Sequence, residues 1–154
     1  MKKVKIFFDT NVLVYAHDEK SPFHEESADL LSCVFTGSVT GVVSEQNLLE
    51  LYRVLTHPAA MSHLPFEPEQ AASLIRRVYL EDAFEVVYTN RSVLQRCLEL
   101  IVQHHVVTAK VFDMRLAAQV LESRVDYLAT YNIGDFKGIQ GIDSKTPKEI
   151  LALF

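Results

Sequence analysis

Residues 4–9 read Val4-Lys5-Ile6-Phe7-Phe8-Asp9, a short apolar run that ends in an acid. Its β-branched and aromatic side chains are typical of a strand that is buried on both faces of a sheet. Strands of this kind occur in parallel sheets, where ligands bind beyond the carboxyl ends of the strands. The run therefore predicts an α/β fold and places Asp9 at the edge of the sheet where ligands bind.

The same alternation of strand and helix continues along the rest of the chain. Further strands are predicted over residues 38–43, 84–88, 126–131 and 139–142. Helices are predicted over residues 21–37, 44–56, 68–80, 90–105 and 112–123, and after the capping box Thr146-Pro147-Lys148-Glu149. Strands separated by helices imply right-handed crossovers and a parallel sheet. We expect a three-layer α/β/α domain with a central parallel sheet of four to five strands. Because no linker or repeat interrupts the pattern, we expect one domain over residues 1–154.

Composition and charge narrow the class of protein. Of the 154 residues, 49% are hydrophobic and 23% are charged, which excludes intrinsic disorder. No apolar run approaches the ~18 residues of a membrane span, and the N-terminal segment lacks the features of a signal peptide. Cys33 and Cys97 show no disulfide or zinc-ligand spacing, so we expect a cytoplasmic protein without a membrane partner. The net charge of −5 argues against broad electrostatic capture of nucleic acid but permits an acidic catalytic centre.

Four acids occupy places where such a fold binds ligands. Asp9 ends the first predicted strand, and Glu50 lies in the helix after the second. Asp113 opens the helix before the strand at residues 126–131, and Asp135 follows that strand. Taken alone, each has a structural explanation, because the aspartates could cap a helix or stabilise a turn. Glu50 lies opposite the apolar stripe of its helix, where a solvent-exposed glutamate is the ordinary outcome.

Taken together, the four carboxylates predict a metal site. Two carboxylates ~4 Å apart repel by roughly 4 kcal/mol at an effective dielectric of about 20, so a cluster must take up protons or hold a cation. Oxygen ligands alone suit Mg²⁺ or Mn²⁺, and Mg²⁺ uses only one or two direct carboxylates and keeps several waters. A metal held in this way activates water and neutralises charge on a phosphate, so the pattern predicts phosphodiester hydrolysis.

Four segments around these acids resemble the motifs of the PIN-domain ribonucleases, and in particular the VapC-type toxins of toxin–antitoxin systems. They follow one another in the family's order, at residues 7–16 (FFDTNVLVYA), 44–55 (SEQNLLELYRVL), 112–118 (FDMRLAA) and 128–136 (LATYNIGDF). The second segment favours Glu50 over Glu45 as the acid. The resemblance spans nearly the whole chain and implies a PIN-like form of the three-layer fold.

The resemblance also implies a function. It points to a metal-dependent endoribonuclease, the toxin of a toxin–antitoxin pair, that hydrolyses RNA phosphodiester bonds. The residues that match the family's catalytic and metal-binding centre, for Mg²⁺ or Mn²⁺, are Asp9, Glu50, Asp113 and Asp135. The matching polar residues that would hold carboxylates or waters in place are Thr10, Asn11, Thr130 and Asn132. The implied partners are an RNA substrate, a cognate antitoxin that blocks the active site, and a second copy of the chain in a homodimer.

Two arginines depart from the family's pattern. Arg115 stands two residues after Asp113, where the family usually has small or apolar residues, and Arg124 stands where a glycine often precedes the last motif strand. Arg115 could contact phosphate, pair with an acid or be a solvated helix residue, and the sequence leaves these alternatives open. Arg53 likewise could contact phosphate or simply solvate the surface of its helix.

Other functions fit the residues less well. Haloacid-dehalogenase-type enzymes carry a second aspartate two residues after the first, where this chain has Asn11. Response-regulator receivers carry an aspartate after the third strand, where this chain has Thr89-Asn90. The main alternative is a catalytically silent PIN-like scaffold that binds RNA or a protein partner. Four clustered carboxylates argue against it, because gathering like charges without a function is costly.

Overall fold

The computed structural model describes residues 2–154. Within this range, the strands of a sheet are connected to one another by helices. The strands are β1 (Lys5–Phe8), β2 (Thr40–Ser44), β3 (Phe84–Val87), β4 (Tyr127–Ala129) and β5 (Ser144–Lys145). The α-helices are α1 (Thr10–Ala16), α2 (His24–Phe35), α3 (Glu45–Leu55), α4 (Pro68–Ile75), α5 (Arg91–Gln103), α6 (Val111–Ser123), α7 (Ile133–Phe136) and α8 (Pro147–Leu151). Two further turns are the π-helical η1 (Arg76–Leu80) and the 3-10 helical η2 (Thr108–Lys110).

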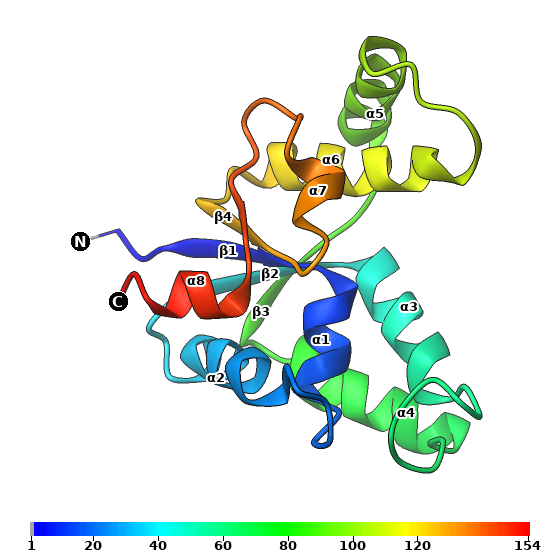
Figure 1. Cartoon of the computed structure of the whole chain (residues 1–154), viewed down its shortest axis with the longest axis vertical. Coiled ribbons are helices and arrows are strands. Elements are labelled where there is room, and N and C mark those ends of the chain that lie inside the picture. Colours follow the sequence, from blue (N-terminus) through cyan, green and yellow to red (C-terminus); the bar gives the residue numbers. More distant parts are fainter. Residues whose placement is uncertain (1) are drawn as a thin grey trace.

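The strands form one parallel sheet in the order β3-β2-β1-β4-β5 (Figure 1). In the central strand β1, Phe7 lies opposite Val42 of β2 and Leu128 of β4. The chain adds β2 and β3 on one side of β1 and then β4 and β5 on the other, so the strand order reverses between β1 and β4. Ligands bind beyond the carboxyl ends of the strands at such a reversal. Asp9 directly follows β1 and lies at this point.

Helices cover both faces of the sheet. Helices α1 to α4 and α8 lie on one face, and α5, α6 and α7 lie on the other (Figure 1). Successive side chains of β1 point to opposite faces, so Ile6 and Phe8 enter the first core and Phe7 enters the second. The predicted three-layer α/β/α fold is confirmed, with five parallel strands in the sheet.

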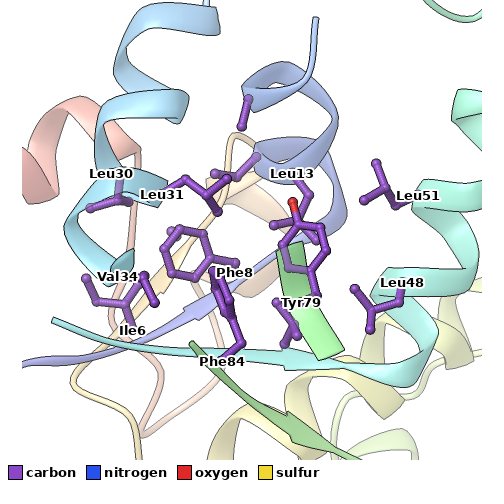
Figure 2. Packing of buried hydrophobic residues seen from close by; sticks show 14 of the residues in the cluster. Ile6, Phe8, Leu13, Leu30, Leu31, Val34, Leu48, Leu51, Tyr79 and Phe84 are labelled. Carbon is purple, nitrogen blue, oxygen red and sulfur yellow. The ribbon is translucent and has the colours of Figure 1, made fainter. Parts of the chain in front are cut away.

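Aromatic residues fill the middle of the first core (Figure 2). Phe8 of β1 packs edge-on against Phe84 of β3, with ring centroids 5.7 Å apart. Tyr79 of η1 lies 5.2 Å from Phe84 on the same measure and is fully buried. Burying a large apolar side chain contributes about 1.5–3 kcal/mol relative to leaving it in water. This packing anchors β1 and so fixes the position of Asp9 at its end.

The prediction of a strand at residues 139–142 is wrong. Gly141 has φ +92°, a left-handed conformation that glycine adopts readily, and the segment forms a turn. Ile139 and Ile142 are apolar because they pack on the second core from this turn. The fifth strand is instead Ser144–Lys145, which pairs with β4.

The helices show three further differences from the prediction. The helix expected from residue 21 begins at His24, because the N–H of His24 closes a turn on the carbonyl of Ser21. The helix expected over residues 68–80 is α-helical only to Ile75 and then widens into η1. Helices α1 and α7 were not predicted as separate elements. Both are short, and both begin within segments that carry candidate site residues.

Candidate active site

The four predicted acids line one open cleft at the carboxyl edge of the sheet. The cleft has a volume of about 380 Å³, and Asp9, Glu50, Asp113 and Asp135 all contribute to its wall. They come from the end of β1 and from α3, α6 and α7. Three of the predicted supporting residues also line it: Thr10, Asn11 and Asn132. Folding therefore gathers residues that lie far apart in the sequence around one cavity.

Asp9 is the most deeply buried of these acids, with 7% of its surface exposed. Its Oδ1 accepts the backbone N–H of Thr10 at 2.7 Å, which also caps α1. Its Oδ2 accepts the Thr130 hydroxyl at 2.8 Å and lies 3.4 Å from Asn11 Nδ2. Burial raises the pKa of Asp9 to about 6, with contributions from the charges of Glu50 and Asp113, although the hydrogen bonds from Thr130 and Thr10 act in the opposite direction. Asp9 thus caps α1, and burial destabilises the ionised form of its side chain.

Glu50 faces the cleft because α3 packs beside α1. The Thr10 hydroxyl donates to Glu50 Oε2 at 2.7 Å, and Gln46 Nε2 donates to Glu50 Oε1 at 2.7 Å. Both carboxylate oxygens are therefore held. Glu50 lies opposite the apolar stripe of its helix, on the side that borders the cleft.

Asn47 supports Thr10 from the start of α3. Its Nδ2 donates to Thr10 Oγ1 at 3.0 Å, and its Oδ1 accepts both the N–H and the hydroxyl of Ser44 in a capping box. Asn47 is fully buried, so its polar atoms depend on these partners. The cap of α3 thereby sets the direction in which the Thr10 hydroxyl points.

The loop after β4 closes the other side of Asp9. Thr130 is fully buried, and its Oγ1 accepts the backbone N–H of Asn132 at 3.0 Å while donating to Asp9. Asn11 Oδ1 accepts the backbone N–H of Tyr131 at 3.2 Å, which ties α1 to this loop. Thr10, Asn11 and Thr130 therefore contact the acids or orient the loop. Asn132 reaches the cleft wall and contributes its backbone to this network.

Asp113 and Asp135 stand on the open side of the cleft, since Asp113 is half-buried and Asp135 is exposed. Burial raises the pKa of Asp113, and the charges of Asp135 and then Glu50 add to this effect, while Lys110 opposes it. The carboxylates therefore lie near enough to disfavour one another's ionisation.

No lysine or arginine of residues 2–154 lines the cleft, and none of its four acids forms an ion pair within that range. A wall of carboxylate, hydroxyl and amide oxygens suits a hard divalent cation, so these residues fit Mg²⁺ or Mn²⁺. Over the same residues, no three His, Cys, Asp or Glu side chains are grouped closely enough to ligate one ion together. A cation here would contact one or two carboxylates and reach the others through water, which is the usual habit of Mg²⁺.

Comparison with known proteins assigns the family. The PIN domain family matches residues 6–141 of the chain. The chain belongs to the PIN domain family. Ribonuclease VapC24 of Mycobacterium tuberculosis is 30% identical to this PIN domain over 129 residues, which cover 83% of the chain and 86% of VapC24. The predicted resemblance to VapC-type PIN proteins is confirmed.

Solved structures show the same fold. The toxin VapC20 of Mycobacterium tuberculosis, which cleaves the sarcin–ricin loop, superimposes with a TM-score of 0.65 at 17% identity, covering 88% of this chain and 95% of VapC20. FitAcB of Neisseria gonorrhoeae gives a TM-score of 0.67 at 15% identity, with 93% and 98% covered. VapBC2 of Rickettsia felis, bound to promoter DNA, gives 0.63 at 20% identity, also with 93% and 98% covered.

Sequence reasoning missed two polar residues of this PIN domain, Asn47 and Gln46. Both lie in the first turn of α3, within the segment that resembles the family's second motif. The capping box around Ser44 is a signal for Asn47, because a side chain at the third helical position turns back toward the preceding strand end. Gln46 lies four residues before Glu50, a spacing that places the two side chains together on a helix. Arg115 contacts this pair, since its Nε donates to Gln46 Oε1 at 2.6 Å.

Proposed function

We propose that this PIN domain is a metal-dependent endoribonuclease that hydrolyses RNA phosphodiester bonds. The observation that carries the proposal is the cleft of carboxylates from four separate elements, none of which forms an ion pair with any of residues 2–154. A surface that only binds polyanionic RNA gains nothing from such a cluster, whereas carboxylates are the ligands that a divalent cation prefers. The similarity to a relative named Ribonuclease VapC24 supports RNA as the substrate class.

The residues of the acidic cleft would have different roles, which depend on their positions. Bound Mg²⁺ or Mn²⁺ would supply an activated water and neutralise charge on the scissile phosphate. Asp9, fixed by Thr10 and Thr130, is the buried carboxylate that would hold the ion. Glu50 is fixed by its two side-chain donors, and Asp113 and Asp135 face the open side, where they would orient waters and meet the substrate. Thr10, Asn11, Thr130 and Asn132 keep this arrangement in place.

We also propose that the protein is the toxin of a toxin–antitoxin pair. The structurally similar proteins include a toxin–antitoxin complex from Klebsiella pneumoniae. A second hollow of about 350 Å³ lies between α3 and the α4–η1 segment and includes Leu49, Leu80 and Tyr88, which are 70%, 52% and 59% exposed. Apolar hollows beside helices accept amphipathic segments of a partner, so this one is the proposed antitoxin contact. A small gene next to this one that encodes a DNA-binding protein would support the pairing.

A homodimer is the proposed assembly. Helix α5 lies at the periphery of the second layer and carries Leu94, Leu98 and Val102 on one line, four residues apart (Figure 1). They are 52%, 54% and 73% exposed. A straight apolar stripe on one helix can pack against its own copy about a two-fold axis. We therefore assign this face to the second protomer.

We further infer that residues 1–154 act as one PIN domain and that the protein works in the cytoplasm, where its proposed substrate is found. Cys33 and Cys97 are free thiols. None of the helices described over residues 2–154 is both long and apolar enough to cross a bilayer.

Incubation of the purified protein with structured RNAs, in Mg²⁺, in Mn²⁺ and in EDTA, tests the activity. We expect cleavage in either metal, no cleavage in EDTA, and no cleavage by Asp9→Asn or Asp113→Asn proteins that keep the wild-type circular dichroism spectrum. Asp82→Asn, a change of an exposed aspartate away from the cleft, serves as the matched control and should cleave normally. If the wild-type protein cuts no RNA under any condition, the silent scaffold is the better description. Full activity of Asp9→Asn would contradict the assigned centre.

A further inference from the structure

Arg115 is held at the border of the acidic cleft. Its guanidinium lies over the ring of Phe112, 5.2 Å from the ring centroid, and its Nε donates to Gln46 Oε1. Gln46 in turn donates to Glu50. Since Nε is the atom that Gln46 engages, the two terminal nitrogens of the guanidinium remain available for a ligand. The side chain is therefore oriented by the protein while most of its donors are unused.

A second arginine faces the same space. A hollow of about 430 Å³ between α3 and α6 has Arg53 and Arg115 in its wall, and we call it the arginine hollow. It shares Gln46 and Glu50 with the acidic cleft, so the two cavities adjoin. A ligand that extends out of the cleft past Gln46 and Glu50 therefore meets the arginine hollow.

The two arginines have no anionic partner in the described part of the chain. Neither Arg53 nor Arg115 forms an ion pair with any of residues 2–154. Glu45 also lines the hollow, and its Oε1 accepts the backbone N–H of Thr89 at 3.4 Å. Both carboxylate oxygens of Glu50 accept hydrogen bonds, one from Thr10 and the other from Gln46. Two guanidinium groups thus border a space whose carboxylates already have hydrogen-bond partners.

We propose that the arginine hollow is a phosphate subsite, in which Arg53 and Arg115 bind a backbone phosphate of RNA next to the phosphate that enters the acidic cleft. The proposal rests on the proposed function, because it assumes that RNA is the substrate. The protein carries a net charge of −5, so attraction for RNA must come from locally placed cations. A guanidinium presents paired N–H donors that match the oxygens of a phosphate.

An acidic protein segment is the other ligand that two arginines can bind. The position of the hollow favours phosphate, because the hollow adjoins the cleft where the scissile phosphate would lie. Phosphates recur along an RNA strand at a regular spacing, so a strand held in the cleft carries its neighbouring phosphates toward adjoining surfaces. An acidic peptide has no equivalent reason to enter at this border.

The salt dependence of RNA binding tests the subsite. Fluorescence anisotropy of a labelled single-stranded RNA is measured with the Asp9→Asn protein, which should bind without cutting, over a series of NaCl concentrations in Mg²⁺. Each phosphate that is no longer bound lowers the magnitude of the negative slope of log K against log salt by about 0.7 for a single strand. Because both arginines bind the same phosphate, we expect a decrease of up to about 0.7 for Arg53→Gln and for Arg115→Gln, and of about 0.7 for the double variant. Arg77→Gln, which removes an exposed arginine of η1 that lines a different hollow, should leave the slope unchanged.

Three results would overturn the proposal. They are an unchanged salt slope in the double arginine variant, an equal change of slope in Arg77→Gln, and the absence of measurable RNA binding. Polyglutamate of matched charge serves as a second probe. The proposal would be overturned if the double arginine variant lost as much affinity for polyglutamate as for RNA. Arginine-dependent RNA binding by a protein that cuts no RNA would instead refute only the nuclease function.

Discussion

The hydroxyl of Thr10 donates a hydrogen bond of 2.7 Å to Oε2 of Glu50, forty positions further along the chain. The backbone N–H of the same residue donates to Asp9 Oδ1, also at 2.7 Å. One residue at the start of α1 therefore holds two carboxylates of the candidate centre at once. Asn47 in turn fixes the position of Thr10, because the Asn47 side-chain amide donates a hydrogen bond to the same Thr10 hydroxyl.

Replacing Thr10 by valine should impair both the site and the fold. Valine has the shape of threonine but no hydroxyl, so Glu50 loses a donor and the buried Asn47 amide loses its acceptor. We expect metal-dependent RNA cleavage to fall by about 10- to 100-fold, the usual effect of removing a residue that orients a metal ligand. We expect the free energy of unfolding, measured in urea, to fall by about 1–3 kcal/mol. Thr10→Ser keeps the hydroxyl and should recover most of both, and a fully active Thr10→Val protein would show that Thr10 does not position Glu50.

Asp9 should make the metal-free protein less stable as the pH rises. Burial raises the pKa of Asp9 to about 6 from its ordinary value of 3.8, so between these values the folded state binds more protons than the unfolded state. The contribution of this group to stability is complete below pH 3.8 and is lost as the pH rises through about 6. The loss amounts to about 3 kcal/mol between the two limits.

Urea unfolding in EDTA at pH values from 4 to 8 measures this effect. Asp9→Asn removes the titrating group while keeping its shape, so its stability should fall less over this range than that of the wild type. Parallel pH profiles for the two proteins would mean that Asp9 is not destabilised by its burial.

Divalent metal should stabilise the folded protein at neutral pH. A cation in the cleft binds the folded state and offsets the mutual repulsion of the carboxylates, so Mg²⁺ or Mn²⁺ should raise the Tm. At a free metal concentration one hundred times Kd, the expected gain is about 2.7 kcal/mol. Asp9→Asn should show a much smaller gain, and EDTA should reverse the gain of the wild type. Equal melting temperatures of the wild-type protein in metal and in EDTA would argue against a metal centre.

A charge on the exposed face of α5 should separate the proposed dimer. Leu98 is the middle residue of the stripe formed with Leu94 and Val102 and is 54% exposed, so Leu98→Glu changes the surface with little effect on the core. We expect the mass measured by light scattering to halve. Leu64→Glu, at a leucine that is 87% exposed and lies outside the helices, is the control and should leave the mass unchanged. An unaltered mass for Leu98→Glu would place the interface elsewhere.

Much of the fold could be predicted from local sequence. The apolar run before Asp9 predicted β1 because a doubly buried strand needs apolar side chains on both of its faces. The capping box at Thr146 predicted the start of α8 because that signal lies within four residues. The strand expected at residues 139–142 failed because apolar residues in a turn that packs on a core look the same as those of a strand. Helix α7 is only four residues long and has no periodicity to detect.

Local sequence predicts the alternation of strands and helices, the class of the sheet and the residue types at the strand ends, since each depends on neighbours along the chain. The orientation of Glu50 is fixed in the folded protein, because the carboxylate is held by Thr10 of α1, a helix that packs beside α3. The same is true of Asn47 behind Thr10, and of Arg115 beside Gln46, whose partners lie 37 and 69 positions away. Hydrogen bonds over such separations exist only once the sheet has brought the elements together, so no local pattern records them.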